Sequence, residues 1–196
     1  MVQHRADKRA RLGVGMHRSL AFGGFSGTGK TTVGRGVAAR TGVAFVDLDQ
    51  VLEDRWGPIP AQFETFGEAE FRVRESRMLA HALEGAAPIV LATGGGTWVA
   101  AENRRLLATC WRVVLSASVA ELRSRVGDSD PRRPLWDGAI EARLAARATA
   151  YAEADLQLDT TGRDADDLAD EIAKWWSDAD SGGRVGYQSA GRQSPA

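Results

Sequence analysis

The sequence is poor in cysteine and in long apolar runs, and each shortage excludes a class of protein. The single cysteine, Cys110, excludes an internal disulfide framework and a metal site built from several cysteines. It stands in the apolar run CWRVVL, which predicts a small buried side chain. No stretch reaches the roughly 18 apolar residues that a membrane-spanning helix needs, and the basic first residues lack the apolar segment of a secretory signal. We therefore expect a cytoplasmic protein that does not bind a membrane.

An excess of charge of either sign is also absent, because the 25 cationic and 26 anionic residues nearly balance. The formal net charge of −1 gives no overall attraction to nucleic acid, so no nucleic-acid partner is expected. Lysine is scarce, because Lys8, Lys30 and Lys174 are the only three among 25 cationic residues. The planar fork of arginine suits carboxylates and phosphates, but a genome-wide codon bias would give the same excess. Composition alone therefore gives the arginines no function.

Length and composition predict one folded domain. The 196 residues, 43% hydrophobic and 26% charged, are ordinary for a globular protein with a substantial core. Residues 1–15 are expected to be a disordered extension, or to precede a true translation start at Met16, which stands just before the first predicted strand. Residues 181–196 are rich in Gly, Ser and Gln, which predicts a disordered tail. The domain is thus expected to span residues 16–180.

Apolar runs alternate with amphipathic stretches along this domain. We expect strands in SLAFGG, VAFVDLD, PIVLAT, CWRVVLS and DLQLDT. Helices are expected after the first strand, over about 60–85, 99–109 and 119–126, up to about residue 152, and in DADDLADEIAKWW. This alternation predicts parallel βαβ units, hence an α/β fold: a three-layer α/β/α sandwich with a five-stranded parallel sheet. The near-continuous apolar strands fit a sheet that is covered on both faces.

The stretch GGFSGTGKTT, residues 23–32, contains a complete Gly-x4-Gly-Lys-Thr pattern between a predicted strand and a predicted helix. In that context backbone N–H groups turn inward around a phosphate, and the helix N-terminus adds a favourable dipole. Lys30 is expected to reach the β- and γ-phosphates of a nucleotide, and the Thr31 hydroxyl to ligate Mg²⁺. The predicted nucleotide-binding residues here are Gly27, Thr28, Gly29, Lys30, Thr31 and Thr32.

The acidic residues at strand ends narrow the use of this phosphate site. NTPases of the motor or switch type carry an acid at the end of an apolar strand, whereas PIVLAT ends in three glycines. VDLD supplies Asp47 and Asp49, which would point the same way on an extended segment. One could hold the metal while the other faces an acceptor hydroxyl. Alternatively, both acids open a helix, where Asp is a common cap.

Three further stretches carry groups that could recognise charge. In FETFGEAEFRVRE, residues 63–75, Arg72 precedes Glu75 by three positions, so Glu75 could orient it. The glycines at 94–96 allow close approach to a small ligand. DPRRPLWDG has the polar, proline-bounded character of a mobile lid, in which Arg133 could swing over a γ-phosphate. Each arginine alone would more often be a solvated surface residue.

In this order, the motifs resemble those of the shikimate kinase family over about residues 18–178. The matching elements are GTGKTT, Asp47-Leu-Asp49, Phe63-x3-Gly67-Glu68-x2-Phe71-Arg72-x2-Glu75, Gly94-Gly95-Gly96, Arg133-Pro134-Leu135 and Arg147-x3-Tyr151. The Gly-Glu-x-x-Phe-Arg and triple-glycine elements are much more diagnostic than the phosphate-binding loop.

The resemblance implies an ATP-dependent enzyme that phosphorylates the 3-hydroxyl of shikimate in aromatic amino-acid biosynthesis, with Mg²⁺ as cofactor. Lys30, Asp49 and Arg133 would be catalytic: Asp49 would orient the attacking hydroxyl, and Arg133 would close over the nucleotide with a lid at about 127–138. Asp47 would help Thr31 place the metal.

The resemblance also implies an acceptor pocket and a place for the adenine. Arg72 and Arg147 would clamp the acceptor carboxylate through charge-assisted hydrogen bonds. The backbone of Gly94, Gly95 and Gly96 would complete the pocket, and Phe63 and Phe71 would form its apolar wall. The adenine would lie between Arg125 and the loop after Asp159. Family members are commonly monomeric, so a monomer is expected.

Two other functions stay open at this stage. One is a kinase for gluconate or a carboxylated cyclitol, because two arginines would serve any carboxylate and Trp98 is expected close to the pocket. The other is a catalytically silent relative that binds nucleotide, although such a relative would be expected to lose the lysine, the acids or the lid arginine. A nucleoside monophosphate kinase shares the loop but does not need the other motifs.

Overall fold

A computed structural model of the protein describes residues 18–126 and 140–182. It contains five strands, β1 (Leu20–Gly24), β2 (Ala44–Asp47), β3 (Ile89–Ala92), β4 (Trp111–Ser116) and β5 (Leu156–Asp159). They form one sheet in the order β2-β3-β1-β4-β5, and each neighbouring pair is parallel. The five-stranded parallel sheet expected from the sequence is therefore confirmed.

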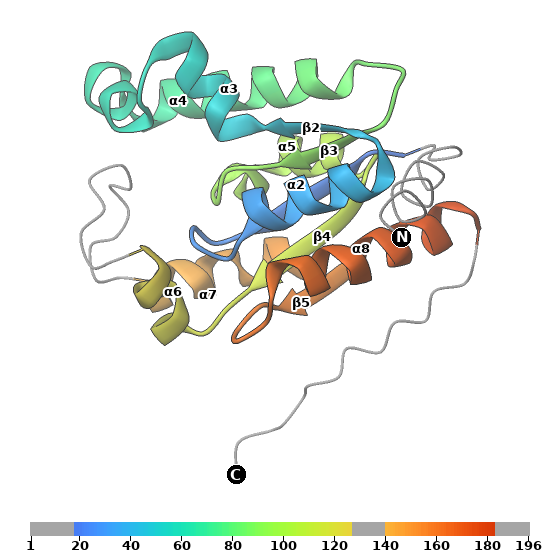
Figure 1. Cartoon of the computed structure of the whole chain (residues 1–196). Helices are drawn as coiled ribbons and strands as arrows, with labels where there is room; N and C mark the ends of the chain where they lie inside the picture. Colours follow the sequence, from blue (N-terminus) through green and yellow to red (C-terminus); the bar gives the residue numbers. More distant parts are fainter. Residues whose placement is uncertain (1–17, 127–139, 183–196) are drawn as a thin grey trace.

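Helices cover both faces of this sheet (Figure 1). They are α2 (Lys30–Thr41), α3 (Leu48–Trp56), α4 (Ile59–Leu83), α5 (Ala101–Leu107), α6 (Val119–Val126), α7 (Ile140–Tyr151) and α8 (Ala165–Asp180), with a 3-10 turn, η1 (Thr97–Val99). None of the helices in the described ranges has the length and apolarity needed to cross a membrane. The three-layer α/β/α architecture agrees with the prediction.

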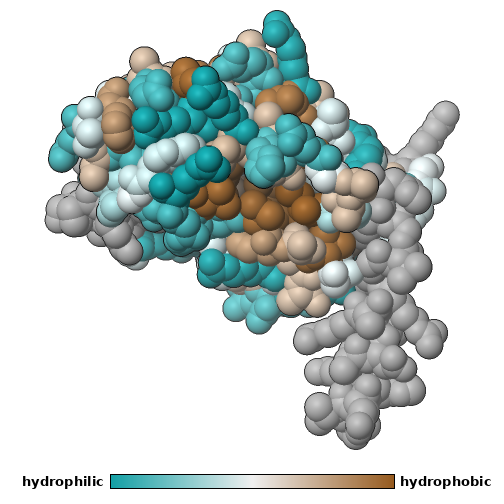
Figure 2. Space-filling view, turned by 90° about the horizontal axis from the view of Figure 1, so that it is seen from above, coloured by the Kyte–Doolittle hydropathy of each residue, from teal (hydrophilic) through white to brown (hydrophobic). Residues whose placement is uncertain are grey.

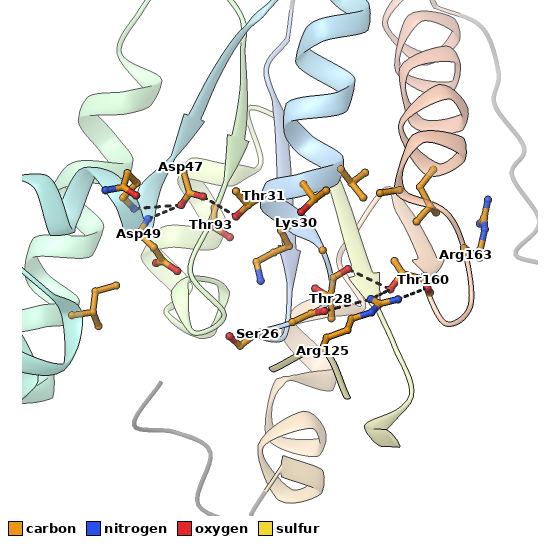
Figure 3. Close-up of a pocket in the computed structure, with 18 of the residues that line it drawn as sticks. Ser26, Thr28, Lys30, Thr31, Asp47, Asp49, Thr93, Arg125, Thr160 and Arg163 are labelled. Atoms are coloured by element: carbon orange, nitrogen blue, oxygen red, sulfur yellow. Dashed lines mark hydrogen bonds between the residues drawn. The ribbon is translucent and has the colours of Figure 1, made fainter. Parts of the chain in front are cut away.

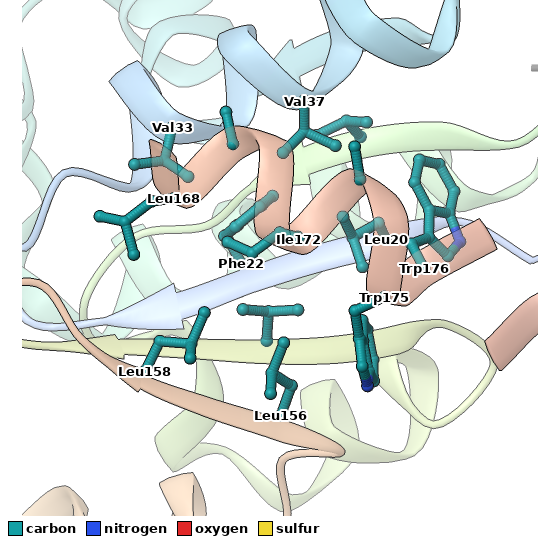
Figure 4. Close-up of a cluster of buried hydrophobic side chains, with 14 of the residues drawn as sticks. Leu20, Phe22, Val33, Val37, Leu156, Leu158, Leu168, Ile172, Trp175 and Trp176 are labelled. Carbon is teal, nitrogen blue, oxygen red and sulfur yellow. The ribbon is translucent and has the colours of Figure 1, made fainter. Parts of the chain in front are cut away.

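The strands divide their side chains between two cores because successive residues of a strand face opposite sides. On one side Leu20 and Phe22 pack with α2 and α8, and Figure 4 shows Ile172, Trp175 and Trp176 of α8 against the strands. On the other side Ala21 and its neighbours pack with α3, α4, α5, η1 and α7. Cys110 belongs to this second core and is 1% exposed, as expected.

A third, smaller cluster of Phe25, Leu122 and Ile140 is also buried, and few large apolar side chains are exposed in the described ranges. Among the described residues, Phe66, Val73 and Val99 are the large hydrophobic side chains classed as exposed. Figure 2 shows a mostly hydrophilic face with a smaller hydrophobic area near its middle. Burial of the apolar strands and helix faces is therefore the main source of stability.

Two expected elements differ from the structure. The strand predicted in VAFVDLD ends at Asp47, and α3 begins at Leu48. The helix predicted over about 60–85 has two parts, because Gly67 has φ 77° and ψ 164° and interrupts the helical path within α4. Helix α3 was not predicted from the sequence, because the acidic residues at its start were interpreted as the end of a strand.

The parallel arrangement brings the carboxyl ends of all strands to one edge. Asp47 pairs with Ala92, Phe22 with Ala92, and Ser116 with Asp159 in the strand registers. In open parallel sheets this edge carries the ligand site, at the position where the strand order reverses. Here that position is the end of β1, which lies between β3 and β4.

Candidate active site

A cavity of about 690 Å³ opens at this edge of the sheet. Its wall includes the whole loop from Ser26 to Thr32, the acids Asp47 and Asp49, and Arg125 (Figure 3). The cavity therefore joins residues as much as 142 positions apart in the sequence, from Ser26 to Leu168. Seven predicted nucleotide-binding residues, those from Gly27 to Thr32 together with Arg125, line the same cavity as the two predicted strand-end acids.

The backbone of the loop can adopt its path because of glycine. Gly24, Gly27 and Gly29 have φ values of 135°, 88° and 92°, which side chains rarely tolerate. A methyl group on Gly24 would also lie 2.2 Å from the carbonyl oxygen of Leu115. Helix α2 begins directly after the loop, so its N-terminus points into the cavity.

Lys30 leans back over this loop. Its Nζ donates hydrogen bonds to the carbonyl oxygens of Gly24 and Phe25, both at 2.9 Å. Thr28 is 1% exposed, and its hydroxyl donates to the Phe25 carbonyl at 2.8 Å. The Thr28 side chain therefore supports the loop from inside, so that only its backbone can meet a ligand.

Thr31 and Asp47 form a pair of oxygen ligands at the base of the cavity. The Thr31 hydroxyl donates to Asp47 Oδ2 at 2.7 Å, while Asp47 Oδ1 accepts from the backbone N–H of Asp49 at 3.1 Å. Within residues 18–126 and 140–182, no three His, Cys, Asp or Glu side chains come together as a metal-binding cluster. The donor set fits Mg²⁺, which usually takes one or two protein ligands and completes its shell with phosphate and water.

The sequence pattern predicted that Asp47 and Asp49 lie on one extended segment, and this prediction was wrong. Asp47 is the N-cap of α3, and Asp49 lies in its first turn. The capping alternative was therefore correct for Asp47, and the same carboxylate also reaches Thr31. A helix begins here because the Asp47 side chain accepts hydrogen bonds from the otherwise unpaired backbone N–H groups of Asp49 and Gln50.

Asp49 lies in an environment that disfavours its charge. Burial raises the pKa of Asp49 to about 6, Lys30 opposes that rise, and Asp47, Glu75 and Glu53 add to it. A carboxylic acid with a pKa near 6 holds and releases a proton close to neutral pH. The Asp49 carboxylate is thus suited to accept a hydrogen bond, or a proton, from a hydroxyl.

The three consecutive glycines after β3 each make room for a different functional side chain. A methyl group on Gly94 would lie 2.7 Å from Asp49 Oδ1, and one on Gly96 would lie 2.7 Å from Arg72 Nη2. A methyl group on Gly95 would lie 3.0 Å from Arg147 Nη1. None of the three has a positive φ, so glycine is needed here for space and not for conformation.

Arg72 is held by two glutamates of its own helix. Its Nη1 donates to Glu75 Oε2 at 2.9 Å, and its Nη2 donates to Glu68 Oε1 at 3.0 Å. Burial alone would lower the pKa of Arg72, but the charges of Glu75 and Glu68 outweigh it, and the pKa is raised. The sequence prediction that Glu75 orients Arg72 is confirmed by this geometry.

Aromatic rings surround the two arginines. Phe63 and Phe71 stack with their ring centroids 4.6 Å apart, and the Arg72 guanidinium carbon lies 5.9 Å and 5.2 Å from these centroids. Arg147, 8% exposed, lies 4.9 Å from the centroid of Phe25. These contacts desolvate the guanidinium groups, which strengthens their hydrogen bonds to an anion.

The far end of the cavity is organised around Arg125. Its Nη1 donates to the Thr160 hydroxyl at 3.0 Å, and its Nη2 donates to the Thr160 carbonyl at 2.9 Å. Thr160 and Arg163 follow β5 and line the same cavity. The expected neighbourhood of Arg125 and the loop after Asp159 is therefore present in the structure.

Comparisons with known proteins agree with this geometry. The sequence profile described as "Shikimate kinase" matches residues 26–177. A shikimate kinase of Geobacter sulfurreducens is 42% identical over 163 residues, which are 80% of this chain and 89% of the relative. One of Ruegeria pomeroyi is 40% identical over 172 residues, 82% of this chain and 86% of the relative.

A solved structure gives the same result. The shikimate kinase from Acinetobacter baumannii in complex with shikimate superimposes with a TM-score of 0.76 and 34% identity, covering 81% of this chain and 92% of that one. The chain belongs to the shikimate kinase family. As a member of that family it is an ATP-dependent kinase with the P-loop kinase fold.

The structure brings together the residues expected for a shikimate kinase site, with three qualifications. Arg133 and the predicted lid lie outside the described residues. Of the predicted acceptor-binding residues, Asp49 lines this cavity, whereas the triple glycine, the two arginines beside it and the two aromatic residues do not: Phe63, Phe71, Arg72, Gly94, Gly95, Gly96 and Arg147. Trp98 lies close to the cavity, as expected, because its Nε1 donates at 2.9 Å to the hydroxyl of Thr93, which lines it, but Trp98 itself is 1% exposed and packs in the core.

Sequence reasoning missed several residues of the cavity wall. Thr93 follows β3 and Thr160 follows β5, so both stand at the edge where ligands bind. Their position after a strand was a usable signal. Gln50 and Glu53 also line the cavity, and they were missed because helix α3 was not recognised. Ile59 lines it from the first residue of α4, just before the predicted start of that helix.

Proposed function

We propose that this protein transfers the γ-phosphoryl group of ATP to the 3-hydroxyl of shikimate. The observation that carries the proposal is the triple-glycine turn, which places a carboxylate and two arginines within 3.0 Å of the positions where three successive methyl groups would stand. Shikimate offers the complementary groups, a carboxylate and several hydroxyls. The known shikimate complex of the Acinetobacter baumannii relative supports the same acceptor.

The proposed acceptor contacts follow from the charges. Arg72 and Arg147 bind the carboxylate, since a guanidinium carries five N–H groups and can hold its glutamate partners while it donates to a ligand. Asp49 accepts a hydrogen bond from the 3-hydroxyl and orients its oxygen toward the γ-phosphorus. Phe63 and Phe71 exclude water from this side, which matters because water is the competing acceptor.

The proposed reaction is a single displacement. The 3-oxygen forms a bond to the γ-phosphorus, the bond from that phosphorus to the β,γ-bridging oxygen breaks, and ADP leaves. The hydroxyl proton passes to Asp49 or to solvent. Lys30 and the loop N–H groups hold the phosphates, and Arg133, outside the described residues, is proposed to neutralise charge on the transferred group.

We also propose Mg²⁺ as the cofactor, held by Thr31 and Asp47, where it would neutralise phosphate charge. Arg125 is proposed to lie beside the adenine. A monomer acting in the cytoplasm stays a prediction, and light scattering of the purified protein would test the first part of it.

The test is ADP release by the purified protein with Mg²⁺-ATP and shikimate, quinate or gluconate in parallel. We expect stimulation by shikimate well above the ATP-only rate, and none in a Lys30→Ala preparation, which controls for contaminating kinases. A preference for gluconate or quinate would instead assign the carboxylated-polyol alternative. No stimulation by any acceptor would favour a silent nucleotide-binding protein.

A further inference from the structure

Behind the arginine that would bind the acceptor carboxylate lies a buried chain of hydrogen bonds. Arg72 Nη1 donates to Glu75 Oε2 at 2.9 Å, and the Thr97 hydroxyl donates to the other oxygen, Glu75 Oε1, at 2.7 Å. Glu75 is 1% exposed and Thr97 is fully buried. Each oxygen of a buried carboxylate thus has a donor, one from the arginine and one from a neutral hydroxyl.

Thr97 is itself fixed in place. Its carbonyl oxygen accepts from Asn103 Nδ2 at 2.9 Å, and its backbone N–H donates to the Gly94 carbonyl at 3.2 Å. Arg104 Nη1 donates to the next two carbonyls, those of Trp98 at 3.0 Å and Val99 at 2.7 Å. The turn that carries the Thr97 hydroxyl is therefore anchored to α5 at three successive carbonyls.

Space for this contact depends on the first glycine of the turn. A methyl group on Gly94 would lie 2.8 Å from Glu75 Oε1 and 3.1 Å from the Thr97 hydroxyl oxygen. The Thr97–Glu75 hydrogen bond thus passes directly beside Gly94, which also borders Asp49. The carboxylate of Asp49 and the Thr97–Glu75 hydrogen bond therefore both lie in the space around Gly94.

We infer that Thr97 is a positioning residue for acceptor binding, whose hydroxyl holds Glu75 so that Glu75 presents the Arg72 guanidinium to the ligand carboxylate. This inference rests on the proposed function for the identity of the acceptor. Without the hydroxyl, Glu75 Oε1 would be buried without its donor, which is costly for a carboxylate. Glu75 would then turn both oxygens toward Arg72 and draw the guanidinium out of its binding orientation.

The test compares Thr97→Val, which removes the hydroxyl and keeps the shape, with Thr97→Ser, which keeps the hydroxyl. We expect Thr97→Val to raise KM for shikimate about tenfold, the effect of one hydrogen bond to a charged group, while KM for ATP and kcat stay within about twofold. Thr97→Ser should stay close to the wild type. Thr97→Ala serves as a second variant without the hydroxyl if Thr97→Val does not fold.

Two controls separate positioning from general damage to the core. Thr41→Val removes another fully buried threonine hydroxyl, which donates to the Val37 carbonyl at the end of α2, and should leave KM for shikimate unchanged. In an Arg72→Ala background, Thr97→Val should add less than twofold, because the group that it positions is gone. Equal effects in both backgrounds, or a Thr97→Ser variant as weak as Thr97→Val, would overturn the inference.

Crystal structures of the unliganded variants test the inference without any acceptor. In Thr97→Val, or in Thr97→Ala, we expect the Arg72 guanidinium to be displaced, and in Thr97→Ser to keep its wild-type position. An undisturbed Arg72–Glu75 pair in Thr97→Val would disprove the positioning role even if shikimate is the acceptor. If the wild type uses gluconate or quinate, the proposed function is wrong, and the same KM comparison with that acceptor still tests Thr97.

Discussion

The Thr31 hydroxyl donates a hydrogen bond to Asp47 Oδ2 at 2.7 Å, which joins the first turn of α2 to the carboxyl end of β2. Asp47 also caps α3, so one carboxylate connects the phosphate-binding loop to the helix that carries Asp49. A metal bound to Thr31 would therefore have a carboxylate within reach, either directly or through a water molecule.

Asp47→Asn should raise the Mg²⁺ concentration needed for half-maximal activity by about tenfold or more, because it removes the charge beside the metal ligand. The measurement is the initial rate against free Mg²⁺ at saturating ATP and shikimate. Asn can still cap α3, so the fold should persist. Asp54→Asn, on an exposed position of the same helix, is the matched control and should leave the curve unchanged. An unchanged Mg²⁺ requirement in Asp47→Asn would remove Asp47 from the metal site.

Substitutions of Arg72 and Lys30 should affect different steps, acceptor binding and turnover respectively. Arg72→Ala removes a charge-assisted contact with the acceptor, so KM for shikimate should rise about 10- to 100-fold, with a smaller effect on kcat. Lys30→Ala should chiefly lower kcat, because Lys30 meets the phosphates. The measurement is kcat and KM for ATP and for shikimate by steady-state kinetics. Arg77→Ala is the control, because Arg77 is exposed on the same helix as Arg72. Wild-type turnover in Lys30→Ala would contradict its assigned role.

The fold and the phosphate-binding loop could be predicted because local signals determine them. The strands are short apolar runs, and the pattern from Gly24 to Thr31 specifies a turn that opens a helix. Family motifs then located Arg72, Arg147 and the triple glycine. The Thr97–Glu75 contact could not be found in this way, because it joins residues 22 positions apart on different elements.

Local signals also misled at one point. The Asp47-Leu-Asp49 sequence reads equally well as the end of a strand and as the start of a helix, since Asp is a frequent N-cap. Only the packing of Leu48 and Leu52 into the second core decides that a helix begins there. The true orientation of Asp49, and with it the contribution of Glu53 to the cavity, followed from that tertiary contact.

Alanine substitutions at different glycines of the triple-glycine turn should cause different kinetic defects. Gly96→Ala would place a methyl group 2.7 Å from Arg72 Nη2, so KM for shikimate should rise about tenfold or more. Gly94→Ala would displace Asp49 and Glu75 together, so kcat should fall as well, by as much as about 100-fold. Gly85→Ala is the control, because the nearest atom to its added methyl group lies 4.0 Å away. Equal kinetics for all three variants would contradict this account of the turn.

The raised pKa of Asp49 predicts that both the activity and the stability of the protein depend on pH. Its pKa of about 6 means that the ionised form is lost on acidification, so kcat/KM for shikimate should fall as the pH drops below about 6. The folded state binds this proton more tightly than the unfolded chain does. The favourable contribution to stability is therefore complete below about pH 4 and is lost as the pH rises through about 6.

Asp49→Asn removes that titration. At pH 7.5 it should increase the free energy of unfolding by up to about 3 kcal/mol while it nearly abolishes turnover, and at pH 4 the gain in stability should disappear. Urea unfolding at both pH values measures the difference, with Asp54→Asn as the matched control on α3. The sign matters most, because a carboxylate that is desolvated in the folded state opposes folding when it is ionised. An Asn variant that is less stable than the wild type at pH 7.5 would show that the Asp49 charge is stabilised by its partners, and would contradict the raised pKa.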